Sequence, residues 1–346
     1  MSKTLQDYAT LINDTIQSNE INHYITTDNM CQNLGGIDTF KNINIPQGKV
    51  RSFQKDDVLL SNIRLYFRKV YRAKQKGGCS SDVLVFRAKH IDSATLFAIL
   101  SSQIFTDYAC SGSQGSKMPR GNKTHMMDFK IPTINFTIAK IFNSIQNKIE
   151  NNHKINELLH TLAYKIYEYY FKYKPKNAKL EQIIIENPKS SIMVKNAQKT
   201  QDKYPFFTSG DNILSYPKAI IDGRNCFLNT GGNAGIKFYV GKASYSTDTW
   251  CICANEFSDY LYLLLSSIKT HINQSFFQGT SLKHLQKNLL KKYPIYMPSV
   301  HEIKKFNQII MPLLTLISIN TRTSKKLEQI RDFLLPLLLK QQVKPK

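Results

Sequence analysis

A glycine-rich stretch at residues 230–250, TGGNAGIKFYVGKASYSTDTW, has the composition of a phosphate-binding loop. In the P-loop of nucleotide-binding enzymes, two glycines separated by four residues precede a lysine and a hydroxyl residue, and backbone N–H groups surround the phosphates. Here the pair Gly241-Lys242 would require a glycine at position 236, which is Ile236, and Ala243 stands where the magnesium-binding hydroxyl belongs. The glycines also miss the spacing of the dinucleotide-binding pattern. We therefore do not expect this stretch to hold a nucleotide.

The same stretch suits the phosphates of a DNA strand. Glycines let backbone N–H groups approach phosphate oxygens closely, and the neighbouring side chains are polar or basic. The candidate DNA-contacting residues of this loop are Asn229, Thr230, Gly231, Gly232, Asn233, Lys237, Tyr239, Lys242, Ser244, Tyr245, Ser246 and Thr247.

A second loop, LLSNIRLYFRKVYRAKQK at residues 59–76, mixes basic and aromatic side chains without an acidic residue. Guanidinium groups bind phosphates or pair bidentately with guanine, and tyrosines can pack on the sugar-phosphate backbone. The alternative is a half-buried hairpin whose aromatic rings face the core, and the pattern leaves both interpretations open for each side chain. The candidates here are Ser61, Asn62, Arg64, Tyr66, Arg68, Lys69 and Arg72, with Lys117, Arg120, Lys123, Ser281, Lys283 and Lys287 as lesser candidates downstream.

Catalytic motifs for DNA chemistry are missing from the sequence. An amino-methyltransferase should carry Asp/Asn-Pro-Pro-aromatic, and the nearest string is Asn187-Pro188-Lys189. A magnesium-dependent nuclease of the common type needs a Pro-Asp dipeptide followed by an acidic-x-Lys pair, and no Pro-Asp occurs. The six cysteines form no C-x-x-C pair and are expected to be small buried hydrophobic residues. We therefore expect no catalytic residue and no metal ligand.

The composition points to a polyanionic partner. The chain of 346 residues carries 47 lysines and arginines against 25 acidic residues, a formal net charge of +22. Such a basic balance favours nucleic acid over a membrane, because no apolar stretch is long enough to span a bilayer. The first residues lack the apolar core of a signal peptide, so a cytoplasmic location is expected. The length suits about two domains.

The sequence contains two similar copies of one long segment. LFAILSS at Leu96 returns as LYLLLSS at Leu261, and SQGS at Ser113 resembles FQGT at Phe277. IPTINFTIAKIFNSI, from residue 131, is echoed by MPSVHEIKKFNQII, from residue 297. The offset between paired segments stays near 165 residues. An internal repeat of this length indicates a duplicated domain rather than a solenoid repeat.

Each copy ends in a segment with helical periodicity. Apolar residues from Phe136 to Phe171 recur at spacings of three and four, which predicts a helix on the order of 50 Å long. The second segment begins with a capping box at residues 299–302 and runs to about residue 340. Both stripes fit a coiled-coil seam, and ordinary core helices are the alternative. Pro312 and Pro336 are expected to kink or break the second helix.

These features together resemble a known family. The segments LLSNIRLYFRKVYRA…GGCSSDVLVF and YPFFTSGDNILSYPKAIIDGRNCFLNTGGNAGIKFYVGKASYSTDTW, each followed by a helical spacer, resemble the two target-recognition domains of type I restriction-modification specificity subunits. KLEQIIIENPKSS, from Lys179, resembles the usual beginning of such a domain. The implied fold class is α+β, with two similar mixed α/β target-recognition domains separated by two long helices packed as an antiparallel coiled-coil spacer, pseudo-two-fold overall.

The resemblance also implies domain boundaries. The expected order is target-recognition domain 1 at 1–134, central spacer helix at 135–172, target-recognition domain 2 at 173–298, distal spacer helix at 299–340 and a basic tail at 341–346.

The implied function is that of a DNA-recognition subunit without chemistry of its own. It would read an asymmetric bipartite target in double-stranded DNA and dock two methyltransferase subunits on the outer apolar faces of the spacers, with restriction subunits joining in the full complex. S-adenosylmethionine, ATP and magnesium would belong to those partners, and no cofactor is expected in this chain. The alternatives are the recognition subunit of a methyltransferase-only complex and an autonomous DNA-modifying enzyme.

Overall fold

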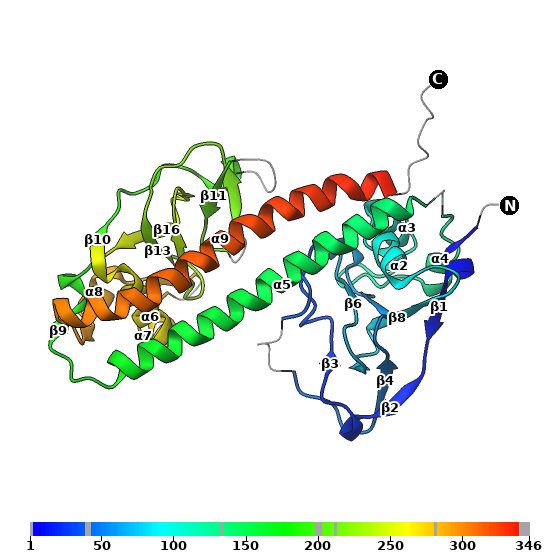
Figure 1. Cartoon of the computed structure of the whole chain (residues 1–346), viewed down its shortest axis with the longest axis horizontal. Helices are drawn as coiled ribbons and strands as arrows, with labels where there is room; N and C mark the ends of the chain where they lie inside the picture. The colour runs from blue at the N-terminus through cyan, green and yellow to red at the C-terminus, as the bar shows by residue number, and fades with distance from the viewer. Residues whose placement is uncertain are drawn as a thin grey trace. The chain divides into compact units, whose positions relative to one another are not determined.

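The computed structural model describes residues 3–38, 43–131, 134–197, 203–210, 213–279 and 282–338 (Figure 1). By compactness the chain divides into unit 1, Met1–Asn151 with Lys326–Lys346, and unit 2, Asn152–Lys325. The expected basic tail at 341–346 and the candidate Ser281 lie outside the described residues. The unit boundaries fall inside the two long helices, so each of these helices contributes residues to both units.

Unit 1 contains two sheets and a layer of short helices. The first sheet has the order β1 (Ala9–Ile12), β8 (Val83–Ala88), β5 (Val58–Ser61) and β6 (Val70–Arg72), with every neighbouring pair antiparallel. The second has the order β2 (Thr15–Gln17), β4 (Lys49–Phe53), β7 (Gly77–Cys79) and β3 (Tyr24–Ile25), in which only the pair of β3 and β7 is parallel. The helices are α1 (Leu5–Tyr8), α2 (Ser93–Leu100), α3 (Gln103–Ser111) and α4 (Lys123–Met127).

Alternating side chains of the first sheet fill two cores in unit 1. Leu60 and Leu84 point into the core shared with α2 and α3, because the side chains of a strand alternate between its faces. Leu59 and Val85 point into the core shared with the second sheet. The fully apolar strands are therefore covered on both faces, which is why they lack the alternating pattern of a half-exposed sheet.

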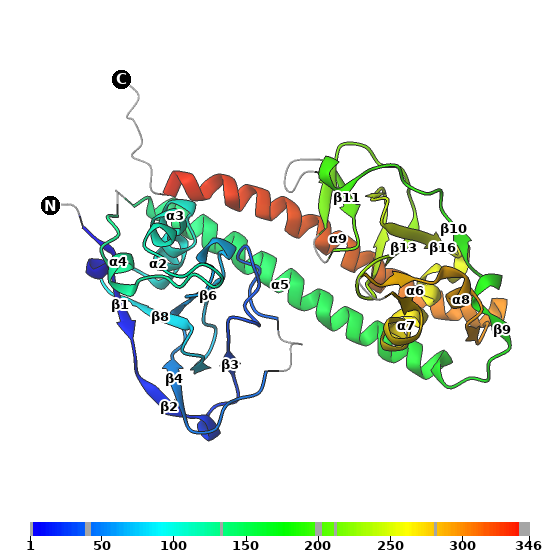
Figure 2. The same ribbon diagram turned by 180° about the vertical axis from the view of Figure 1, so that it is seen from behind.

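Unit 2 repeats this architecture. Its first sheet has the order β10 (Ile185–Glu186), β16 (Thr249–Cys253), β13 (Arg224–Asn229) and β14 (Ile236–Val240), again antiparallel throughout. A second sheet contains β12 (Leu214–Tyr216), β11 (Tyr204–Phe207) and β15 (Ser244–Tyr245), with β11 and β15 parallel. The short pairs are β17 (Phe277–Gln278) with β18 (His284–Leu285), and β9 (Ala178–Lys179) with β19 (Pro294–Ile295). Figure 2 shows α6 (Ser258–Ser267), α7 (Lys269–Ser275) and α8 (Lys287–Lys291) beside the first sheet of unit 2.

The two units share the strand order of the first sheet and the short helices that follow it. In each, the third strand of the first sheet turns back into the fourth, the second sheet adds a short strand paired in parallel, and three short helices precede a long one. This common strand order confirms the duplicated domain that the sequence predicts.

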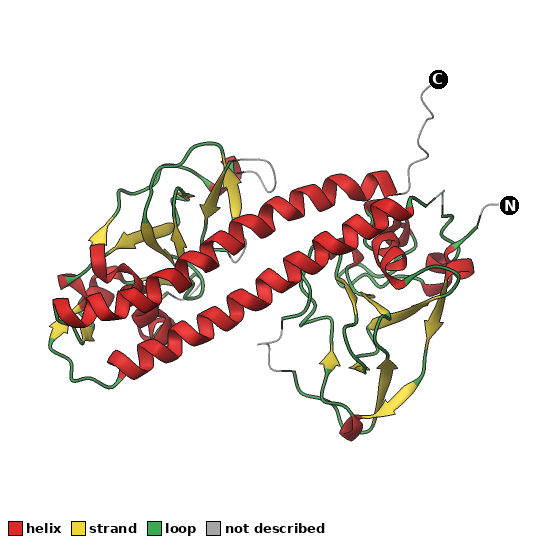
Figure 3. Ribbon diagram, viewed as in Figure 1, coloured by secondary structure: helices red, strands yellow, loops and turns green. Residues whose placement is uncertain are grey.

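The long helices are α5 (Phe136–Tyr167) and α9 (Val300–Leu338), drawn as continuous red ribbons in Figure 3. At 1.5 Å per residue they are about 48 Å and about 58 Å long. A π-helical turn, Glu168–Lys172, follows α5. These bounds agree with the two helical segments expected from the periodicity.

Within each unit the helical segments run antiparallel. In unit 1, Asn135 N–H donates to the carbonyl of Leu338 at 3.1 Å, at the start of α5 and the end of α9. In unit 2, Asn152 Nδ2 donates to Ser324 Oγ at 3.2 Å, and Asn320 Nδ2 donates to Asn156 Oδ1 at 3.0 Å. The seam therefore contains hydrogen-bonded polar side chains as well as apolar ones. Buried polar groups of this kind fix the register of a helix pair.

The prolines were expected to kink or break the distal helix, and the break does not occur. α9 runs through Pro312 and Pro336 without interruption. A proline removes the hydrogen bond to the carbonyl four residues earlier, which for Pro312 is that of Gln308. Both Gln308 and Pro312 are exposed, so water can bind the released carbonyl.

Two expected absences can be checked over the described part of the chain. Among its helices, none has the combination of length and apolar character that crossing a bilayer requires. The same residues contain no cluster of His, Cys, Asp and Glu side chains that could hold a metal ion.

Burial raises the pKa of Cys79 and of Cys251 to about 12, so these thiols stay protonated, as packing residues would.

Candidate nucleic-acid interface

In unit 1, a turn and a loop from distant parts of the sequence lie side by side. The turn joins β5 to β6 and contains the short helix η2 (Leu65–Phe67), and the loop joins α3 to α4. Arg64 N–H donates to the carbonyl of Pro119 at 2.9 Å, and Gly121 N–H donates to the carbonyl of Asn62 at 3.1 Å. We call residues 62–68 with 113–121 surface 1.

Unit 2 has the same pairing of turn and loop. The turn joins β13 to β14, and the loop joins α7 to α8. Gly232 N–H donates to the carbonyl of Lys283 at 2.9 Å, and Leu285 N–H donates to the carbonyl of Thr230 at 3.0 Å. We call residues 229–235, 277–279 and 282–284 surface 2. The basic loop residues that looked secondary in the sequence thus lie next to the main candidate turns.

The repeated Gln-Gly turn shapes both loops. Gly115 has a φ of 100° and Gly279 a φ of 142°, a region that residues with a Cβ rarely adopt. A Cβ on Gly279 would also lie 2.3 Å from the carbonyl oxygen of Leu282. Both glycines are therefore required by the backbone path.

An apolar side chain is exposed at the same position of each loop. Met118 follows Gln114 by four residues and is 55% exposed, and Leu282 follows Gln278 by four residues and is 57% exposed. The sequence reasoning did not select either residue. Their shared place in the repeat is the signal that could have found them, because a single exposed apolar residue is ordinary but a repeated one on a basic surface is not.

Four of the unit 1 candidates are exposed on or beside surface 1. They are Tyr66, Lys117, Arg120 and Lys123. Arg120 also forms an ion pair with Asp82 at 3.1 Å. Tyr66 is 53% exposed and lies at the tip of η2. These side chains can reach a ligand without rearrangement of the fold.

Arg64 and Arg68 flank η2 in an unusual backbone conformation. Their φ angles are 51° and 49°, in the left-handed region that costs a non-glycine residue free energy. Arg64 Nη2 donates to the carbonyl of Lys117 at 3.2 Å, which joins the turn to the loop. Arg68 Nη2 donates to the carbonyl of Ser101 at 2.9 Å, and burial lowers the pKa of Arg68. Strained residues of this kind cluster at functional sites.

The other unit 1 candidates have internal contacts. Ser61 and Asn62 are buried, and Lys69 Nζ donates to the carbonyl of Thr27. Arg72 lies at the opposite end of β6 from the turn, where it contacts Ser93 Oγ at 3.3 Å. The side chains of Ser61, Lys69 and Arg72 therefore belong to the fold, and Asn62 contributes only its backbone to surface 1.

The unit 2 candidates divide in the same way. On surface 2, Asn233 and Lys283 are exposed, as is the neighbouring His284. Gly231 and Gly232 are half-buried, and the N–H of Gly232 already donates to Lys283, so that group is not free for a phosphate. Asn229 is buried.

Several polar candidates of unit 2 support the fold instead. Tyr239, Ser244, Tyr245 and Ser246 are buried, and the Tyr245 hydroxyl donates to the carbonyl of Pro188. Their internal contacts remove them from reach of a duplex in this conformation.

Lysines of unit 2 also differ in their surroundings. Lys237 Nζ donates to the carbonyl of Thr208 at 2.8 Å and to Asn229 Oδ1 at 3.2 Å. Lys287 lies over the ring of Trp250 with Nζ 5.1 Å from its centroid, and burial lowers the pKa of Lys287. Thr247 is exposed in the loop that precedes β16.

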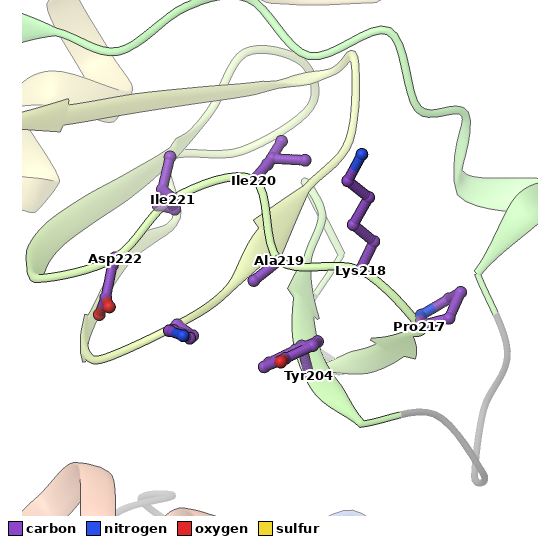
Figure 4. Close-up of a pocket in the computed structure, with 8 residues that line it drawn as sticks. Tyr204, Pro217, Lys218, Ala219, Ile220, Ile221 and Asp222 are labelled. Atoms are coloured by element: carbon purple, nitrogen blue, oxygen red, sulfur yellow. The ribbon is translucent and has the colours of Figure 1, made fainter.

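Lys242 lies at the other end of the β13–β14 hairpin. It lines an open hollow of about 480 Å³ with Tyr204, Lys218 and Asp222 (Figure 4). Because Asn229 and Arg224 are the opposite ends of β13, and Arg224 pairs with Val240, this hollow is separated from surface 2 by the length of the hairpin. Lys242 therefore does not belong to surface 2.

Comparison with known proteins identifies the second half of the chain. Residues 176–329 match the model of the type I restriction modification DNA specificity domain. These residues are therefore similar to a type I restriction modification DNA specificity domain. Over these residues the match confirms the resemblance stated from the sequence. No curated protein sequence gives a significant match.

One solved structure shares the fold of this chain over nearly its whole length. The S subunit of a type I restriction-modification system from M. genitalium is 14% identical, with a TM-score of 0.64 over 99% of this chain and 96% of that chain. The HsdS subunit from Thermoanaerobacter tengcongensis is 13% identical, with a TM-score of 0.37 over 98% of this chain and 96% of that one. The chain therefore has the α+β fold with two long helices that the sequence predicts.

Proposed function

We propose that the chain is the specificity subunit of a type I restriction-modification complex and that surfaces 1 and 2 each read one part of a bipartite DNA target. The observation that carries this proposal is the repeated turn–loop pair, which two units of the same strand order present with exposed basic side chains. Phosphate contacts from these side chains would position the duplex, and a few contacts to base edges would read it.

The two parts of the target should differ in sequence. Surface 1 offers Arg64, Tyr66 and Arg120, whereas surface 2 offers Asn233 and His284. Guanidinium groups pair best with guanine, and side-chain amides pair best with adenine. Different chemistry on equivalent surfaces supports an asymmetric target.

The helices α5 and α9 are proposed to hold the two recognition surfaces at a fixed separation. Two continuous helices bend far less than a loop linker of the same length. Their lengths of about 48 Å and about 58 Å exceed one turn of B-DNA, about 34 Å. A gap of unread base pairs between the two parts of the target follows from this arrangement. In this organisation the recognition domains are 1–134 and 173–298 and the spacers 135–172 and 299–340.

Exposed apolar faces on the helices support docking of methyltransferase subunits. On α5, Ile155, Leu158 and Leu162 are exposed at spacings of three and four, which places them on one face. On α9, Phe333 and Leu337 are exposed four residues apart, on one face of the helix.

Restriction subunits would join in the full complex, and S-adenosylmethionine, ATP and magnesium would bind the methyltransferase and restriction subunits. The proposed location is the cytoplasm. A methyltransferase-only complex remains the second candidate.

Genome-wide mapping of methylated adenines, with and without this gene, tests the proposal. We expect one motif with two specified parts and a gap of fixed length to lose methylation when the gene is deleted. Unchanged methylation in a strain that expresses the gene, or loss of a single uninterrupted motif, would contradict it. The purified chain with S-adenosylmethionine should not methylate the motif, and methyl transfer by the chain alone would support the autonomous-enzyme alternative.

Met118 and Leu282 should contribute apolar contacts to DNA, one in each part of the target. Burial of such a side chain stabilises a complex by about 1.5–3 kcal/mol. We expect Met118→Ala and Leu282→Ala each to weaken binding to the mapped motif by about tenfold or more. Val300→Ala, which also truncates an exposed apolar residue but lies outside both surfaces, is the matched control. Binding constants from fluorescence anisotropy that are equal for all four proteins would remove these residues from the interface.

Leu158 and Phe333 should determine partner affinity. We expect Leu158→Ser and Phe333→Ser each to weaken binding to the methyltransferase subunit by about tenfold or more, because each buries a large apolar side chain in the complex. Isothermal titration calorimetry measures the effect. Lys148→Ser, an exposed residue of α5, is the control, and DNA binding by the isolated chain should not change. Partner affinity equal to that of the wild type would locate the docking face elsewhere.

A further inference from the structure

A charged side chain is buried near the end of α9 in unit 1. Arg331 is only 2% exposed. Removal of a guanidinium from water is costly unless its donors are satisfied. Arg331 Nε contacts Asp332 Oδ1 at 3.0 Å, and Nη1 donates to Gln146 Oε1 on α5 at 3.1 Å. The guanidinium of Arg331 is therefore held by polar partners on both α9 and α5.

The hydrogen bonds continue from Gln146 into a strained segment. Gln146 is itself buried, and its Nε2 donates to the carbonyl of Leu34 at 2.7 Å. Leu34 and its neighbour Asn33 have φ angles of 61° and 54°. Two consecutive non-glycine residues in the left-handed region persist only where the surroundings hold them. Gln146 supplies one of those constraints.

The strained segment holds the turn of surface 1. Asn33 N–H donates to the carbonyl of Phe67 at 2.9 Å, and Leu34 N–H donates to the carbonyl of Arg68 at 3.1 Å. These carbonyls belong to the turn whose outer side carries Arg64 and the exposed Tyr66. A continuous path of hydrogen bonds therefore runs from α9 through α5 and the segment at Leu34 to the back of the candidate recognition turn.

We propose that Arg331 and Gln146 are positioning residues for DNA recognition by unit 1. They fix the segment Asn33–Leu34, which holds the turn in the single conformation that presents Arg64 and Tyr66. The proposal rests on the proposed function of surface 1. Neither residue touches DNA, because both are buried. A turn that is already fixed in its DNA-binding conformation binds DNA more tightly, because less conformational freedom is lost in the complex. Recognition by the unit built from the first part of the sequence thus depends on residues near the end of α9.

The double variant Arg331→Met with Gln146→Leu separates positioning from stability. Replacement of a buried polar pair by apolar side chains of similar volume is often neutral or stabilising, so this protein should fold. The path to Leu34 is nevertheless lost. We expect hydrogen exchange of the amides in residues 62–72 of the free full-length chain to become about tenfold faster, while the thermal midpoint stays near that of the wild type. Arg331→Lys, which keeps a donor for Gln146, should retain more of the wild-type protection from exchange than the double variant does.

The DNA readout uses a duplex with the mapped motif and two duplexes in which one half of the motif is scrambled. Tyr66→Ala identifies the half read by surface 1, because that variant leaves the path intact. We expect the double variant to lose about tenfold in discrimination at this half and none at the other. Ile330→Ala, an exposed position on the same segment of α9 that lies on neither recognition surface, is the neutral control. Leu335→Ala, a buried apolar position there, is the packing control.

The outcomes are distinguishable. If Leu335→Ala speeds exchange in residues 62–72 and loses discrimination as much as the double variant does, general docking of α9 explains the effect and the proposal is overturned. Wild-type exchange and discrimination in the double variant would also overturn it, with the proposed function intact. A wild-type chain that discriminates neither half would remove the proposed function and this inference with it.

Discussion

The affinity of this chain for DNA should fall by about three to five decades as salt rises from 50 to 200 mM. This range follows if six to ten phosphates are neutralised, because each neutralised phosphate releases condensed counterions into the solution. The net charge of +22 supplies the cations, and the exposed lysines and arginines of surfaces 1 and 2 are where they would meet the duplex. Fluorescence anisotropy with the full chain at several salt concentrations gives the slope of log K against log salt.

Single lysine variants assign that slope to a surface. Lys283→Ala, on surface 2, should lower its magnitude by about one and weaken binding to all sequences alike. Lys242→Ala, at the other end of the β13–β14 hairpin, is a matched control and should leave the slope unchanged. An affinity that does not respond to salt would remove the argument from charge. Equal effects of the two variants would displace the interface from surface 2.

Arg224→Met should lower the free energy of unfolding of unit 2 by about 3–5 kcal/mol. Arg224 pairs bidentately with Asp259, whose side chain is 2% exposed, and donates to Thr315 Oγ1 at 3.0 Å. Without Arg224 the carboxylate of Asp259 stays buried without its charge partner, which is costlier than the loss of the pair itself. Denaturation by urea, monitored by circular dichroism, measures the change.

The pH dependence of stability and a double variant test whether the unpaired carboxylate of Asp259 causes the loss. Burial already raises the pKa of Asp259, and Arg224 opposes that shift, so the pKa should rise further in Arg224→Met. A raised folded-state pKa means that the native variant binds more protons than the unfolded chain, so its stability should fall as pH rises above the ordinary range of a carboxyl group. Arg224→Met with Asp259→Leu should recover most of the loss. A single variant as stable as the wild type would show that the pair contributes little.

Local patterns in the sequence determine the parts of this fold that repeat or have a period. The recurrence of LFAILSS as LYLLLSS predicted two copies, because homologous segments adopt the same elements. The apolar spacing over α5 and α9 predicted long helices, because that stripe must be buried along one face. The expected break at Pro312 was wrong, because the cost of a proline depends on whether the carbonyl it releases reaches water, and the sequence does not show exposure.

Candidate site residues could not be sorted by type alone. Tyr66 and Tyr245 both lie in polar loops, yet Tyr66 is exposed at the tip of η2 and Tyr245 is buried with its hydroxyl bound to Pro188. The difference comes from which neighbours cover each loop, and those neighbours are far away in the sequence. Met118 and Leu282 escaped selection for the same reason, since an apolar residue is usually core.

The sequence by itself determined that the chain is basic, duplicated and divided by two long helices, because charge, repetition and period are properties of order along the chain. Only the tertiary structure decided that the turn at Arg64 meets the loop at Pro119, and that Arg331 packs behind the segment at Leu34. Contacts between residues 55 to 185 positions apart depend on which packed surfaces and hydrogen-bond donors are complementary. That complementarity exists only after the elements have folded and docked.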